Sequence, residues 1–128
     1  MPELQRILLV EDEPDIQRVA EVALEMIGGF TLQICSSGKE AIDIAASFQP
    51  DIIVLDVMMP EMDGPATLIA LRKISEIEKV PAIFMTAKVQ ADKLVQLNAL
   101  GAEGIIAKPF SAMKLADQIR EIWQQFSQ

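Results

Sequence analysis

Ile52-Ile53-Val54-Leu55 is a short apolar run that is followed directly by a carboxylate, Asp56. Three other short runs have the same form, and they end in Glu11-Asp12, in Thr86 and in Lys108-Pro109. Short apolar runs separated by helical patterns are typical of buried parallel strands. The working crevice of an open α/β sheet lies at the carboxyl ends of its strands. We therefore expect these polar side chains to meet in one crevice.

The pattern along the chain alternates five times between strand and helix. The predicted strands are about Arg6–Val10, Thr31–Cys35, Ile52–Leu55, Ala82–Met85 and Ile105–Ala107. The predicted helices run from Pro14 to Gly28, from the Ser37 capping box to Phe48, from Pro65 to about Ile74, from Ala91 to Leu100, and from the Ser111 cap to Phe126. This alternation implies right-handed crossovers between parallel strands. Residues 1–128 are thus predicted to form a single doubly wound α/β domain with five parallel strands and five helices. For its strand order we adopt the flavodoxin-like 2-1-3-4-5, one of the common orders of doubly wound sheets.

Composition excludes several classes of function. The formal net charge of −8 repels a polyanion, so we expect no nucleic-acid binding by this domain. No apolar run is long enough to cross a bilayer and the N-terminus shows no signal peptide, which predicts no membrane contact and a cytoplasmic location. The chain contains no histidine, which rules out a histidine triad, a histidine-ligated zinc site and a phosphohistidine in this chain. Its one cysteine, Cys35, lies in an apolar run and is interpreted as a small core residue.

The charged residues at the strand ends predict a magnesium site suited to phosphoryl chemistry. In the order 2-1-3-4-5 the first and third strands are neighbours, so Glu11, Asp12 and Asp56 should converge. Three close carboxylates repel one another unless a cation lies between them, and oxygen ligands favour Mg²⁺. Lys108 adds an ammonium and Thr86 a hydroxyl, both of which can stabilise charge on a transferring phosphoryl group. A carboxylate can itself accept that group as an aspartyl phosphate.

The chain resembles, along its whole length, the receiver domain of two-component response regulators. The matching motifs are Leu9-Val10-Glu11-Asp12-Glu13, Asp56 followed by Met59-Pro60-Glu61-Met62-Asp63-Gly64, Thr86-Ala87, and Gly101-Ala102 ahead of Lys108-Pro109-Phe110. The resemblance implies that Asp56 is the phosphoacceptor and that Asp12 and Asp56 bind Mg²⁺ directly. It further implies metal contacts from Glu11 through water and from the backbone carbonyl of Met58. Thr86 and Lys108 would bind the phosphoryl oxygens, and the Lys108-Pro109 peptide would be cis.

The resemblance also implies the partners. The donor would be a histidine kinase or a histidine phosphotransfer protein, and phosphorylation would alter a surface read by a downstream protein. The domain would not be an enzyme that turns over free substrates, since its chemistry would be limited to self-phosphorylation from a phosphohistidine and autodephosphorylation.

The chain departs from the family pattern in two respects. Ile105 stands three residues before Lys108, where the family usually has an aromatic residue, and the chain has no tyrosine. Glu103-Gly104 and Lys114 replace the charged pattern through which one branch of transcription factors forms dimers.

Beside the site, Met58 and Lys88 stand at two positions where an acidic or amide side chain could orient a water molecule. Their presence there predicts a long-lived phosphoryl group on Asp56.

Two other classes of protein remain as alternatives. A magnesium-dependent phosphohydrolase acting through an aspartyl phosphate would often carry a second aspartate two residues after the first, where this chain has Met58. A flavodoxin-like cofactor binder would need a Ser/Thr-rich phosphate loop after the first strand, where Glu11-Asp12-Glu13 would repel a phosphate instead.

Overall fold

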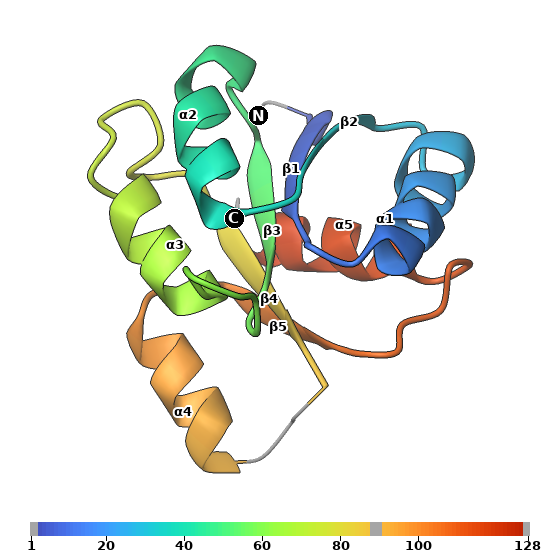
Figure 1. The fold of residues 1–128 in the computed structure, drawn as a ribbon. Helices are drawn as coiled ribbons and strands as arrows, with labels where there is room; N and C mark the ends of the chain where they lie inside the picture. Colours follow the sequence, from blue (N-terminus) through green and yellow to red (C-terminus); the bar gives the residue numbers. More distant parts are fainter. Residues whose placement is uncertain (1–2, 88–90, 127–128) are drawn as a thin grey trace.

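The computed structural model describes residues 3–87 and 91–126, which build one five-stranded parallel sheet between two layers of helices (Figure 1). The strands are β1 (Arg6–Val10), β2 (Thr31–Cys35), β3 (Ile52–Asp56), β4 (Ala82–Thr86) and β5 (Gly104–Ala107). Their order in the sheet is β2-β1-β3-β4-β5, and all pairs are parallel. The predicted fold class and strand order are therefore confirmed.

Helices cover both faces of the sheet. The helical segments are α1 (Pro14–Glu21) with its continuation η1 (Val22–Ile27), α2 (Gly38–Phe48), α3 (Gly64–Leu71), α4 (Ala91–Ala99) and α5 (Leu115–Phe126). In Figure 1, α1 and α5 lie on one side of the sheet, and α2, α3 and α4 lie on the other. Among the described residues, no helix is long and apolar enough to cross a membrane.

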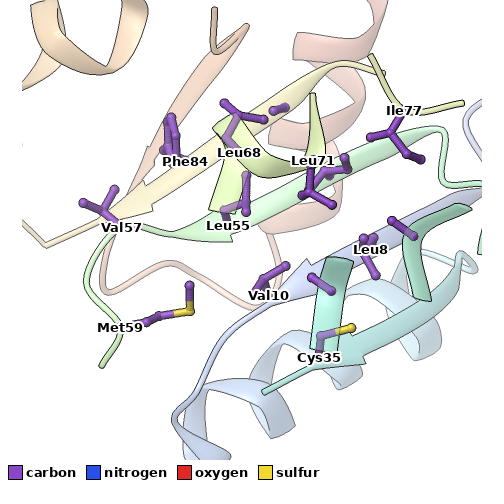
Figure 2. Close-up of a cluster of buried hydrophobic side chains, with 14 of the residues drawn as sticks. Leu8, Val10, Cys35, Leu55, Val57, Met59, Leu68, Leu71, Ile77 and Phe84 are labelled. Carbon is purple, nitrogen blue, oxygen red and sulfur yellow. The ribbon is translucent and has the colours of Figure 1, made fainter. Parts of the chain in front are cut away.

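The continuous apolar runs follow from this two-sided cover. Successive side chains of a strand point to opposite faces, so a strand with helices on both sides needs apolar residues at every position. In β3, Ile53 and Leu55 join the cluster under α2 and α3, whereas Ile52 and Val54 join the cluster under α1 and α5. Figure 2 shows the first cluster, including Leu8, Val10, Leu55, Leu68, Leu71 and Phe84. The two apolar clusters pack the helices against both faces of the sheet and so fix the positions of its strands.

Cys35 belongs to this first cluster and is fully buried. Burial raises the pKa of its thiol to about 12, and the nearby charge of Glu40 adds to the rise. A thiol with so high a pKa is inert at neutral pH, which agrees with the predicted core role.

The first helix differs from its prediction. Instead of one α-helix to Gly28, the chain forms α-helix to Glu21 and π-helix from Val22 to Ile27. The Gly28 amide donates to the carbonyl of Ala23, five residues back, which is the spacing of a π-helix. The end of η1 is tied to α5, because the Arg120 guanidinium donates to the Gly28 carbonyl at 2.6 Å. Such a contact across 92 residues leaves no trace in helical periodicity.

Two other helix ends were predicted incorrectly. The third helix ends at Leu71 rather than near Ile74. Beyond it, the amides of Lys73 and Ile74 donate to carbonyls three residues back instead of four, which is not the α-helical spacing. The last helix begins at Leu115 rather than after Ser111, since the Ser111 carbonyl accepts the amides of both Lys114 and Leu115 and so closes a separate turn.

The capping box of α2 is partly as predicted. The Ser37 hydroxyl accepts the Glu40 amide at 3.1 Å. The Glu40 carboxylate reaches back to the amide of Ser36, at 3.4 Å, instead of that of Ser37.

Candidate functional site

The polar residues predicted to converge do so at the carboxyl edge of the sheet. Glu11 and Asp12 follow β1, Asp56 ends β3, Thr86 ends β4 and Lys108 follows β5. One carboxylate oxygen from each of Glu11, Asp12 and Asp56 lies within 4.8 Å of the other two. Apart from Asp12 and Lys108, which are partly exposed, these side chains are buried, and Glu11 has no exposed surface.

Backbone hydrogen bonds fix the site residues in position. The Glu11 amide donates to the Cys35 carbonyl at 2.9 Å, which extends the pairing of β1 with β2 by one residue. The Lys108 amide donates to the Thr86 carbonyl at 2.9 Å, which does the same for β5 and β4. The backbone at Glu11 and Lys108 is therefore held in the sheet by these hydrogen bonds. The Lys108-Pro109 peptide is cis, as predicted.

Lys108 joins two of the three carboxylates. Its Nζ donates to Glu11 Oε1 at 2.9 Å and to Asp56 Oδ1 at 3.1 Å. Burial by itself lowers the pKa of Lys108, but the hydrogen bonds and charges of Glu11 and Asp56 outweigh it and hold the pKa above its ordinary value. The lysine therefore remains an ammonium throughout the physiological range.

The pKa of the Glu11 carboxyl is raised in the folded protein. Burial raises its pKa, and the charge of Asp56 adds to the rise, while the hydrogen bonds from Lys108 and from the Glu13 amide oppose it. The net shift is upward, so the folded protein holds a proton on Glu11 more tightly than the unfolded chain does. The metal-free fold consequently loses stability as the pH rises through the pKa of Glu11. A bound cation would offset this cost.

The third carboxylate has an oxygen suited to a metal. Asp12 Oδ1 is shielded from solvent and accepts no hydrogen bond within the part of the chain that the structure describes. A buried acceptor without a partner is unfavourable by about 1–3 kcal/mol. Because an oxygen of this same carboxylate lies within 4.8 Å of Glu11 and Asp56 oxygens, the donor set fits a hard divalent cation such as Mg²⁺.

Two residues support the site through contacts that were not predicted from the sequence. The Gln17 amide group donates to the Glu11 backbone carbonyl at 2.6 Å and to the Ser36 hydroxyl at 3.1 Å, and so ties α1 to the loop after β1. The position of Gln17, three residues after the helix-starting Pro14, could have indicated this contact.

The second missed residue is Gly64, whose amide donates to the Val57 carbonyl at 2.9 Å. A Cβ at Gly64 would lie 2.3 Å from the backbone oxygen of Asp56. The loop from Val57 to Gly64 therefore returns directly against the phosphoacceptor candidate, and only glycine fits there.

Of the remaining candidate residues, Met58 is 67% exposed beside the site, while Ile105 is half-buried against the cluster under α2 and α3. Lys88 lies outside the described residues.

Comparison with known proteins agrees with this geometry. Residues 7–120 match the family described as response regulator receiver domain. The chain is 38% identical over 119 residues to a probable transcriptional regulator, ycf27, of Guillardia theta, covering 92% of this chain and 45% of that protein. It is 30% identical over 122 residues to the response regulator Rre1 of Synechocystis, covering 95% and 53% respectively. The chain thus spans about half the length of these relatives.

The fold also matches solved structures. The chemotaxis protein CheY4 of Vibrio cholerae superposes with a TM-score of 0.87 at 27% identity, covering 94% of this chain and 99% of that one. Sequence match, fold and the acidic pocket beside a lysine all agree, and the chain belongs to the receiver-domain family of two-component response regulators.

Proposed function

We propose that this domain takes a phosphoryl group from a phosphohistidine donor onto Asp56 in the presence of Mg²⁺. The observation that carries the proposal is the contact of the Lys108 ammonium with Asp56 at 3.1 Å, beside two further carboxylates. A cation at the attacking carboxylate is well placed to meet the negative charge of an incoming phosphoryl group. Membership of the receiver family favours this function over the hydrolase and cofactor-binder alternatives.

Each candidate residue has a role in this proposal. An Asp56 oxygen forms the bond to phosphorus as the donor's imidazole leaves. Lys108 and the Thr86 hydroxyl bind the phosphoryl oxygens. Mg²⁺ would be held by the carboxylates of Glu11, Asp12 and Asp56 and by the Met58 carbonyl, and would supply positive charge against the carboxylates and the phosphoryl group.

Membership of the receiver family favours a histidine kinase or a histidine phosphotransfer protein as the donor. The phosphohistidine would have to lie on another protein, because this chain contains no histidine. The relatives are named as regulators of transcription or response regulators, and this chain spans about half their length. Output to a downstream protein is therefore proposed for the domain, which at a net charge of −8 would not itself contact nucleic acid.

The proposal is tested by removing the metal. With acetyl phosphate and Mg²⁺, intact-mass measurement should show one phosphoryl adduct per chain, and EDTA should suppress its formation by at least about 100-fold. Equal labelling with and without Mg²⁺ would exclude the proposed metal role, and no labelling under either condition would exclude the phosphoacceptor function.

Lys108→Ala should separate phosphorylation from its structural consequence. The adduct should still form, at a rate reduced by about tenfold, because the metal still neutralises much of the charge. The change in amide exchange that phosphorylation produces in wild type should be lost, since no ammonium links the phosphoryl group to the loop after β5. The role assigned to Lys108 is wrong if the exchange change persists unaltered.

The lifetime of the adduct should depend on the side chain at position 58. Met58 is exposed and apolar, so it partly screens the approach of water and cannot orient it. Met58→Asn combined with Lys88→Glu should shorten the lifetime by about tenfold, equivalent to about 1.4 kcal/mol of barrier. The decay of the adduct in Mg²⁺ measures this.

A matched control is Met26→Asn, which replaces another exposed methionine, on η1. Its adduct should decay as in wild type. Equal decay of the Met58→Asn/Lys88→Glu protein and wild type would show that these positions do not set the lifetime.

A further inference from the structure

An apolar groove of about 360 Å³ opens beside the acidic pocket. It is lined by Glu13, Ile16, Val19, Ala87, Lys108, Pro109 and Phe110. A second hollow of about 380 Å³ continues from it along the helix, sharing Val19 and reaching Val22 and Ala112. Val19 is 42% exposed, so part of its side chain is accessible to a ligand.

Lys108 connects the groove to the phosphoacceptor site, and two other lining residues directly follow site residues in the sequence. Lys108 lines the groove, and its ammonium contacts Asp56 and Glu11. Glu13 directly follows Asp12, and Ala87 directly follows Thr86. A molecule whose phosphoryl end lies at Lys108 would therefore have the groove beside it for the rest of its structure.

We propose that this groove is a leaving-group subsite for small acyl phosphates that carry an apolar acyl group. The inference rests on the proposed phosphoacceptor function of Asp56. The Lys108 ammonium complements the phosphoryl end, and the apolar surface of Ile16, Val19 and Phe110 complements the acyl end. The volume matches a ring or a short alkyl chain, since small-ligand pockets begin at about 300 Å³.

The chemical step balances without a further reactant. An Asp56 carboxylate oxygen bonds to phosphorus, and the bond between phosphorus and the acyl oxygen breaks. The electron pair of that bond stays with the acyl oxygen, so the acyl group leaves as a carboxylate and needs no proton at neutral pH. Apolar contact with the groove would hold the acyl group while this bond breaks, so a larger apolar acyl group should react faster.

The experiment compares acetyl phosphate with benzoyl phosphate at one Mg²⁺ concentration, using the rate of adduct formation by intact mass. The ratio of the benzoyl rate to the acetyl rate should fall about threefold in Val19→Ser and about tenfold in Ile16→Ser/Val19→Ser. Using the ratio cancels the intrinsic difference between the two donors. The matched control is Ile69→Ser, which removes an exposed isoleucine from α3 and should leave the ratio unchanged.

The outcomes separate this proposal from the function on which it rests. If both donors label wild type and the ratio is the same in Val19→Ser, the subsite proposal is overturned and the phosphoacceptor function stands. An equal slowing of both donors in Val19→Ser also overturns it, because the helix would then act on the site as a whole. If neither donor labels wild type, the phosphoacceptor function fails first, and the subsite fails with it.

Discussion

Asp56→Asn should gain no phosphoryl adduct from acetyl phosphate and Mg²⁺, with a loss in rate of at least about 100-fold. The amide oxygen of asparagine can still accept a hydrogen bond from Lys108, so the local packing is preserved while the nucleophilic carboxylate is lost. Asp56 is 5% exposed, at the end of a strand with no exposed residue, and the substitution is nearly isosteric. Intact-mass measurement over time gives the result directly.

Two control variants make this result specific. Asp43→Asn removes an exposed carboxylate on α2 and should label as wild type. Asp12→Asn should label more slowly, and added Mg²⁺ should partly restore the rate, because Asp12 is assigned to the metal. An Asp56→Asn protein that gains the adduct at the wild-type rate would sink the assignment of Asp56 as phosphoacceptor.

Gly64→Ala should destabilise the fold by about 3 kcal/mol and slow adduct formation by at least about tenfold. The added Cβ would lie 2.3 Å from the Asp56 carbonyl oxygen and 3.0 Å from Val57 Cα. Both are backbone atoms, so the end of β3 or the start of α3 must move. A movement of the end of β3 would displace the Asp56 carboxylate from Lys108. Urea unfolding followed by Trp123 fluorescence measures the stability, and mass measurement the rate.

The matched control is Gly29→Ala at the end of η1. No atom lies within 4 Å of a Cβ added there, although the backbone φ of +73° is unfavourable for alanine. This variant should lose about 1 kcal/mol from backbone strain alone and label at the wild-type rate. Equal effects of the two substitutions on labelling would show that contact with Asp56 is not what Gly64 provides.

Much of the fold follows from local pattern. The apolar runs of β1, β3 and β4 are unbroken because each strand is covered on both faces, and that pattern alone separates a parallel sheet from a half-exposed one. The helix starts at Pro14 and Ser37 were predicted correctly because capping depends on neighbouring residues. The helix ends near Leu71 and Leu115 were not, because they depend on competing turns.

The convergence of the candidate site was also predictable. Each of Glu11, Asp56, Thr86 and Lys108 lies at or directly after the end of a strand, and strand order then determines which ones are neighbours. The sequence could not assign the hydrogen bonds within the cluster. Lys108 is separated from Glu11 by 97 residues and from Asp56 by 52, and its choice of partners depends on sheet twist and side-chain packing.

The parallel sheet, the acidic pocket at its carboxyl edge and the residues that line this pocket could be predicted from the sequence, because strand pattern and position at a strand end are local properties. Three features could be seen only in the folded molecule: an Asp12 oxygen is buried with no hydrogen-bond partner among residues 3–87 and 91–126, Gly64 lies against Asp56, and a groove opens beside Lys108. These features depend on distances between segments far apart in the chain. Such distances are settled only when the helices pack on the sheet.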